Sequence, residues 1–164
     1  MILGIDPGLA NLGWAVLQSR TETGNRKPEI GIKLVACGVI KTKNGDGEAK
    51  RLGYIYQELE KLIKKYKVEA VAIETLFFAR NTSSALPVAE AIGVIKVCGV
   101  RCGLEVFGYT PLQVKMALVG YGRAEKDQVE VMVKSALGIE GEIKPSHASD
   151  AVAVGLTHLF TMRV

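Results

Sequence analysis

The stretch "EAVAIETLFFARN", residues 69 to 81, holds an apolar run that ends in a carboxylate and is followed by two large aromatic residues. Ala70 to Ile73 are apolar at every position, which is typical of a strand covered on both faces. Glu74 ends this strand, and Phe77 and Phe78 stand just beyond it, where a loop should begin. The pattern predicts a buried strand that carries an acidic side chain at its end.

Length and composition favour one domain of a soluble, cytoplasmic protein. The 164 residues suffice to bury a core, and although 48% are apolar, no apolar run is long enough to span a bilayer. Met1 leads straight into a predicted strand, so we expect no signal peptide and no membrane partner. Three cysteines without the spacing of a redox or zinc pair are expected to be reduced core residues, with metal binding as the alternative. The net charge of +4 permits a polyanionic partner but does not demand one.

The periodicity of apolar residues predicts an α/β fold with one mixed sheet and helices packed on its faces. Buried or alternating runs predict strands at 1–6, 12–19, 32–42, 70–74 and 104–110, with a polar loop at 20–29. Helical spacing predicts helices at about 49–66, at 82–101, after 125, and from Ser146, which we expect to be an N-cap. Three strands followed by alternating strands and helices indicate a single domain over residues 1–164.

Two acids end two of the predicted interior strands. Asp6 ends the first strand and Glu74 ends the fourth. If these strands are parallel neighbours, their ends lie ~5 Å apart. Two carboxylates that close repel each other and raise each other's pKa unless a cation lies between them. The alternative is that each acid is a solvated strand end, which is ordinary for an Asp before Pro-Gly.

The last predicted helix begins with a second polar pair. His147 and Asp150 are three residues apart and share a face of its first turn. The rest of the helix is nearly all apolar or small, so its polar start must face something. A surface histidine and an Asp that favours the helix start remain the alternative. Together with Asp6 and Glu74, the pair would give a ligand set that suits Mg²⁺ or Mn²⁺.

Four segments resemble a known family, in order and in spacing. They are "ILGIDPGLANLGWAV", "AIETLFFARNTSSAL", "YTPLQVKMALVGYGRAEKDQV" and "SHASDAVAVGLTH". Together they resemble the bacterial RuvC Holliday-junction resolvases, the crossover junction endodeoxyribonucleases of DNA recombination and repair. The resemblance implies a ribonuclease-H-like five-stranded fold, a homodimer, four-way junction DNA as the substrate, and a RuvA/RuvB-type branch-migration complex as a partner.

The resemblance also implies a catalytic and metal site. The acidic positions of the family map onto Asp6, Glu74 and Asp150, and its fourth position maps onto His147, as metal ligand or as base for the attacking water. In the two-metal scheme, Mg²⁺ ions, with Mn²⁺ as a substitute, lie ~3.5–4 Å apart on one phosphate. Asp6 would bridge them, while Glu74 and Asp150 would each favour one ion. Paired nicks would leave 5′-phosphate and 3′-hydroxyl ends.

Aromatic and basic residues supply the DNA contacts that the resemblance implies. Phe77 would stack on a base unpaired at the junction centre, with a place in the core as the alternative, and Phe78 is expected to be core. Lys115 and Lys126 match positions that contact the DNA backbone, and two further cations could extend this track, Arg80 and Arg123. A run of lysines in the first long helix is expected to be a solvated face: Lys61, Lys64, Lys65 and Lys67.

The helix at 82–101 carries small residues at helical spacing, namely Ala85, Ala89, Gly93 and Val97. This stripe permits close packing against a second copy, although it could equally lie on the sheet. Two other functions remain open. One is a non-catalytic junction-binding module of the same fold. The other is a phosphate-binding ATPase lobe, because "GIDPG" resembles the first phosphate loop of actin-like and sugar kinases, which need two lobes.

Overall fold

One mixed sheet organises the part of the chain that the computed structural model describes, residues 1–22, 29–75 and 82–162. The strand order is β3-β2-β1-β4-β5. The strands are β1 (Ile2–Asp6), β2 (Asn11–Glu22), β3 (Glu29–Lys41), β4 (Ala70–Glu74) and β5 (Glu105–Tyr109). The first three are antiparallel neighbours, while β4 runs parallel to β1 and β5 runs parallel to β4. The mixed sheet predicted from the sequence is confirmed.

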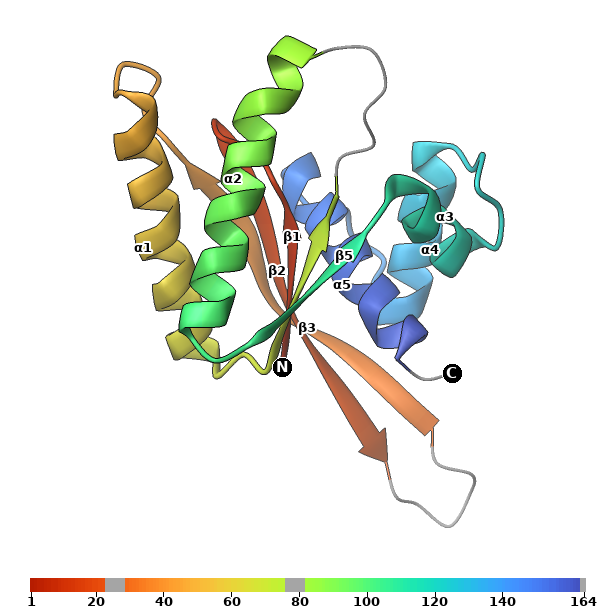
Figure 1. Ribbon diagram of the computed structural model, residues 1–164. Coiled ribbons are helices and arrows are strands. Elements are labelled where there is room, and N and C mark those ends of the chain that lie inside the picture. The colour runs from red at the N-terminus through yellow and green to blue at the C-terminus, as the bar shows by residue number, and fades with distance from the viewer. Residues whose placement is uncertain (23–28, 76–81, 163–164) are drawn as a thin grey trace.

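Helices cover both faces of the sheet (Figure 1). They are α1 (Glu48–Tyr66), α2 (Thr82–Arg101), α3 (Pro111–Val119), α4 (Lys126–Leu137) and α5 (Ser146–Thr161). On one face lie α1 and α2, and on the other α5 crosses the strands diagonally with α3 and α4 beside it. None of the helices in the described ranges has both the length and the apolar character that crossing a bilayer requires.

Side chains of β1 and β4 alternate between two apolar clusters. Leu3, Ile5 and Ile73 belong to the cluster under α1 and α2, as expected for strands buried on both faces. On the α5 side the same strands present small residues, including Gly4 and Ala72. Asp6 and Glu74 continue this second series, so the alternation directs both carboxylates toward α5.

Glycines in the sheet let α5 approach the strands at backbone distance. A Cβ added to Gly13 would collide with the carbonyl oxygen of His147, and one added to Gly4 would collide with that of Ala151. These neighbours are backbone atoms of a buried helix and cannot yield. The first turn of α5 is therefore held directly against β1 and β2, which fixes its polar residues relative to the end of β1.

The predicted N-cap of α5 is wrong by one residue. Pro145 is the N-cap, in an extended conformation, and Ser146 is the first helical residue, with no side-chain capping bond. The physical reason is that the carbonyl oxygen of Pro145 already accepts hydrogen bonds from the N–H groups of Ala148 and Ser149, at 2.9 and 3.3 Å. The helix starts from backbone bonds alone.

Two further elements differ from the prediction. The polar loop expected at 20–29 is shorter, since β2 and β3 remain paired out to Glu22 and Glu29. An antiparallel ladder needs only backbone bonds, so polar side chains do not end it. Sequence periodicity also missed α3, whose start is a capping box between Thr110 and Gln113 with Pro111 as its first residue.

The three cysteines are free thiols, and none belongs to a cluster of metal-ligating side chains within the described residues. Cys98 is fully buried in the cluster beneath α1 and α2, whereas Cys37 and Cys102 are half-buried. Burial raises the pKa of Cys98 to about 12, which keeps this sulfur protonated. Cys98 is a core residue as expected, whereas Cys102 and Cys37 pack against the two clusters from half-buried positions.

Candidate active site

The two strand-end acids lie side by side. β1 and β4 are parallel, with Ile5 opposite Ile73, so Asp6 and Glu74 occupy the next position of the same register. On its other side, Asp6 is paired with Gly13 of β2. The expected juxtaposition of two carboxylates at one end of neighbouring strands is confirmed.

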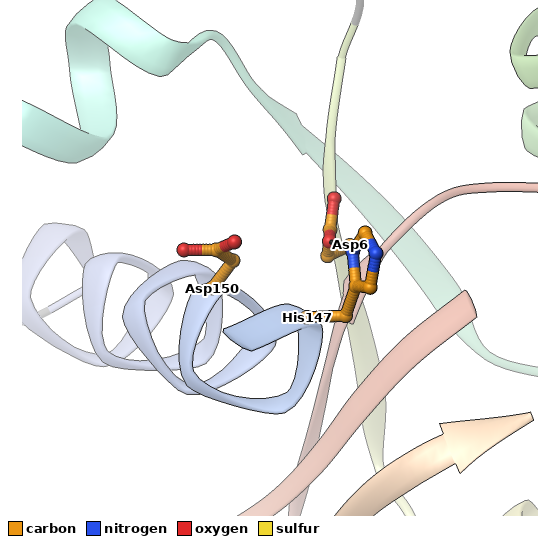
Figure 2. A group of neighbouring side chains, drawn as sticks. All are labelled: Asp6, His147 and Asp150. Carbon is orange, nitrogen blue, oxygen red and sulfur yellow. Dashed lines mark hydrogen bonds and ion pairs between the residues drawn. The ribbon is translucent and has the colours of Figure 1, made fainter. Parts of the chain in front are cut away.

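The first turn of α5 adds an imidazole and a third carboxylate. The Nδ1 atom of His147 lies 2.7 Å from an Oδ atom of Asp6, and Figure 2 shows the ring directed at this carboxylate. Asp150 follows one turn along the helix. One ligand atom from each of Asp6, His147 and Asp150 lies within 4.8 Å of the others. Residues far apart in the sequence thus form one compact donor set.

Repulsion and burial shape the ionisation of the acids. Burial raises the pKa of Glu74 to about 7, with further upward contributions from the charges of Asp6 and Asp150. The pKa of Asp6 is also raised, mainly by burial, although its hydrogen bond to His147 opposes this rise. The site therefore gathers more negative charge than its surroundings neutralise. Carboxylate oxygens and an imidazole in this situation suit a divalent cation such as Mg²⁺ or Mn²⁺.

One lysine already lies against the acids. The Nζ atom of Lys126, at the start of α4, is 2.9 Å from an Oδ atom of Asp150. Lys126 and Lys115 line one pocket together with Glu74 and Asp150. Both lysines that the sequence predicted to contact DNA backbone thus border the acidic site. Arg123 is exposed between α3 and α4 and is not among the residues that line this pocket.

Of the other predicted site residues, Glu74 is in the described part of the chain and three are not. Glu74 lies beside Asp6 but outside the group of ligand atoms within 4.8 Å. Phe77, Phe78 and Arg80 lie outside the described residues, so their predicted contacts with DNA or core stay predictions.

Sequence reasoning missed the role of two glycines. Gly4 and Gly13 interrupt apolar strands, and a glycine inside a strand often marks the close approach of another backbone. That signal was available in the sequence, but only the structure shows that the approaching backbone is the first part of α5. Gly13 is the residue of β2 that pairs with Asp6, and it also lies against the carbonyl group of His147. The geometry of the site depends on it.

Comparison with known proteins then places this arrangement. The sequence model of the family "Crossover junction endodeoxyribonuclease RuvC" matches residues 2–158. The chain belongs to this family. The RuvC protein of Rubrobacter xylanophilus is 42% identical over 164 residues, which are 100% of this chain and 87% of the relative.

Solved structures of the RuvC family agree. The structure of Thermus thermophilus RuvC superposes with a TM-score of 0.88 at 36% identity, covering 99% of this chain and 95% of the other. A second structure, of the same RuvC in complex with a Holliday junction substrate, gives a TM-score of 0.87 at 36% identity, covering 99% and 94%. The ribonuclease-H-like α/β fold implied by the resemblance is confirmed.

Proposed function

We propose that the chain, as a single domain over residues 1–164, is an endonuclease that resolves four-way DNA junctions during recombination and repair. The observation that carries the proposal is the donor set of Asp6, His147 and Asp150 beside Glu74, in a member of the RuvC family. The complex of Thermus thermophilus RuvC with a Holliday junction substrate supports the choice of DNA substrate.

The acids hold the cofactor in this proposal. Asp6, Glu74 and Asp150 bind Mg²⁺, with Mn²⁺ as a substitute and two ions per site, because their mutual repulsion is relieved by cations. When bound, such ions make water a better nucleophile and offset the charge that develops on the leaving oxygen. The acids therefore act as metal ligands. Because water attacks the phosphate and the 3′ oxygen leaves, the products carry a 5′-phosphate and a 3′-hydroxyl.

His147 acts as the base toward the attacking water. Its Nδ1 atom lies 2.7 Å from the carboxylate of Asp6 and donates its hydrogen there. The neutral ring then keeps its lone pair on Nε2, which accepts a proton from water. Asp6 holds both the tautomer and the direction of the ring. The alternative is that His147 is a metal ligand, through one of its two ring nitrogens.

Cations and an aromatic bind the DNA. Lys115 and Lys126 lie beside the acids and neutralise backbone phosphates near the cut, while the exposed Arg123 extends the track. Asp150 is paired with Lys126, and when a metal ion neutralises this carboxylate, the lysine becomes free to bind DNA. Phe77 stacking at the junction centre and Arg80 on the backbone rest on the family resemblance alone.

The protein works as a homodimer through α2. Gly93 and Val97 of the small-residue stripe are exposed, and Val97 keeps 55% of its surface accessible. The residues of α2 that are buried lie on another face, including Ile95 and Cys98. The end of the stripe at Gly93 and Val97 is therefore open to a second copy, whereas Ala85 and Ala89 are half-buried. Sedimentation at micromolar concentration should give a dimer, and monomers that bind junctions one at a time would contradict this. A RuvA/RuvB-type complex is the further partner that the family resemblance implies.

A nicking assay on a synthetic four-way junction tests the proposal. We expect paired nicks with Mg²⁺ and none with a chelator. Asp6→Asn should slow single-turnover cleavage on the order of a thousandfold or more, because several kcal/mol of charge stabilisation are lost. Glu74→Gln and Asp150→Asn should do the same, while all three variants still bind the junction.

The alternatives predict other outcomes of the same assay. A junction-binding module would bind without nicking in any divalent metal. An ATPase lobe would bind ATP and ignore the junction. Near-normal cleavage by any of the three acid variants would show that the assignment of that residue is wrong.

A further inference from the structure

A basic pocket lies where β3 leads into α1. Its lining includes four cations and one carboxylate among the described residues: Lys41, Lys43, Lys50, Arg51 and Asp46. Thr42 and Tyr54 complete it, and the Tyr54 ring is 44% exposed. Such a concentration of positive charge suits a polyanion.

The pocket is tied to the loop that follows Asp6. The Thr42 hydroxyl donates to the carbonyl oxygen of Leu9 at 2.6 Å, and the Thr42 N–H donates to that of Ala10 at 3.1 Å. Arg51 in turn donates its Nε–H to the Thr42 hydroxyl at 2.8 Å. In Figure 1 the start of α1 lies at the same end of the sheet as the β1–β2 connection. The pocket and the candidate active site therefore share one edge of the sheet.

Arg51 is positioned in advance for an anion. Its bond to Thr42 uses one of the five N–H donors of the guanidinium, which leaves the other edge of the fork for a phosphate. Lys41 and Lys43 are exposed beside it. Asp46 neutralises Lys50 at 2.8 Å, so it does not cancel the remaining three charges.

The other lysine group of α1 provides a contrast. Lys61 and Lys64 are paired with Glu58 and Glu60 of the same helix, at 2.7 and 3.0 Å. Those lysines form a solvated face, as their spacing predicted, and they lie toward the opposite end of α1. The acid nearest to the basic pocket in sequence, Glu48, turns instead toward Glu90 of α2. The positive charge near the start of α1 thus exceeds the negative charge around it, whereas the lysines near its end are paired with acids of the same helix.

We propose that Lys41, Lys43 and Arg51 bind the phosphate backbone of a DNA arm on the α1 side of the active site. This inference rests on the proposed junction cleavage, and it adds a contact surface across the site from Lys115 and Lys126. The acidic site lies between the two cationic surfaces along one edge of the sheet. An arm that contacts the basic pocket is held on both sides of the phosphate to be cut.

Salt dependence of junction binding tests the pocket. The test variant is Lys41→Gln with Lys43→Gln. The matched control is Lys61→Gln with Lys65→Gln, which removes the same charge from exposed positions toward the other end of α1. Binding of a labelled four-way junction is measured by anisotropy in chelator over a series of KCl concentrations. Each phosphate contact contributes about 0.9 to the slope of log Kobs against log [salt].

We expect the slope to fall by about 1 to 2 in the test variant and to stay at the wild-type value in the control, with unchanged melting temperatures for both. Equal slopes for test and control, or an equal loss of affinity in both, would overturn the proposal. The wild-type nicking assay is read separately. If the wild type binds junctions but cuts none in Mg²⁺, the proposed activity fails while the slopes still decide the pocket.

Discussion

The two histidines of the chain lie on one helix and occupy opposite environments. They are eleven residues apart, close to three turns, so both face the sheet from α5. The side chain of His147 is 45% exposed and meets the carboxylate of Asp6. His158 is 3% exposed and lies 2.8 Å from the hydroxyl of Tyr109. Its ring packs against Phe107 at a tilt, with 4.6 Å between ring centroids.

The difference shows that the partner and the depth of burial decide what an imidazole can do. Burial lowers the pKa of His158, so this ring stays neutral and its hydrogen bond serves the core. His147 is partly exposed to water and is hydrogen-bonded to the carboxylate of Asp6. The same residue type is structural at the buried position and available for proton transfer at the exposed one.

Replacing each histidine by alanine gives the sharpest test of this contrast. His147→Ala should slow cleavage at least about a hundredfold, the usual contribution of a general base, with little change in melting temperature. His158→Ala should lower the free energy of unfolding by about 3 kcal/mol, because it opens a cavity and leaves the buried Tyr109 hydroxyl without its partner. Cleavage rates and thermal melts of both variants are the measurements.

Tyr109→Phe is the matched control for the buried end. It removes the hydroxyl from His158 without opening a large cavity, so the loss of stability should be smaller than for His158→Ala. Cleavage by the folded protein should remain near normal in both. If His147→Ala melted far below the wild type, or if His158→Ala abolished cleavage while stable, the two roles would be reversed.

Adding one methyl group where α5 meets β2, at Gly13 or at Gly155, is expected to have a smaller effect on cleavage. Gly13→Ala would drive its Cβ into the carbonyl of His147, moving the first turn of α5 away from Asp6. Gly155→Ala instead meets a terminal methyl group of the fully buried Leu17 side chain at 2.6 Å, and it touches no part of the site. We expect Gly13→Ala to reduce cleavage about tenfold or more and to raise the Mg²⁺ concentration needed for half-maximal rate.

The control separates positioning from stability. Gly155→Ala should cost stability of about 1–3 kcal/mol, typical of overpacking, and leave the Mg²⁺ dependence as in the wild type. A purely structural role of Gly13 would lower the melting temperature without shifting the Mg²⁺ dependence. In that case the close approach of α5 would not set the geometry of the site.

The sequence predicted the site better than the surfaces around it. Asp6 and Glu74 end continuous apolar strands, and the polar start of a buried helix had to meet them. These are local patterns, although each also allowed a solvated strand end or a surface histidine until the structure brought the residues together. The family resemblance supplied the role of each residue, which periodicity alone left open.

What could not be predicted depends on contacts between distant segments. Nothing local in "KTKNGDGEAKR" shows that Thr42 fixes Arg51 or that the loop after Asp6 lies beside it. The contact of Gly13 with α5 was equally hidden, although a glycine inside a strand was a visible signal. The capping box of α3 is visible in the sequence, as Thr110 and Gln113 around Pro111, but the apolar residues that follow it are too few to show helical periodicity.

Glu74 at the active site and His158 in the core are expected to change the free energy of unfolding with pH in opposite directions. In metal-free protein, the pKa of Glu74 rises from 4.5 to about 7 on folding, so the folded state binds more protons between these values. The contribution of Glu74 to the free energy of unfolding is therefore full at low pH and is lost as pH rises through about 7. His158 acts in the other sense. Its pKa is lowered on folding, so its contribution is lost as pH falls below 6.5, where the unfolded histidine takes up a proton.

The smallest expected effect is the one that isolates Glu74. Glu74→Gln resembles the protonated acid. In chelator, the free energy of unfolding of this variant should match that of the wild type at pH 5 and exceed it by ~1–2 kcal/mol at pH 8. The difference stays this small because nearby water and Lys126 screen part of the unfavourable charge. Added Mg²⁺ should stabilise the wild type more than the variant and narrow this gap at pH 8. Denaturant titrations at the two pH values, with and without Mg²⁺, measure it. A difference that is equal at both pH values would mean that burial and the neighbouring carboxylates do not raise the pKa of Glu74.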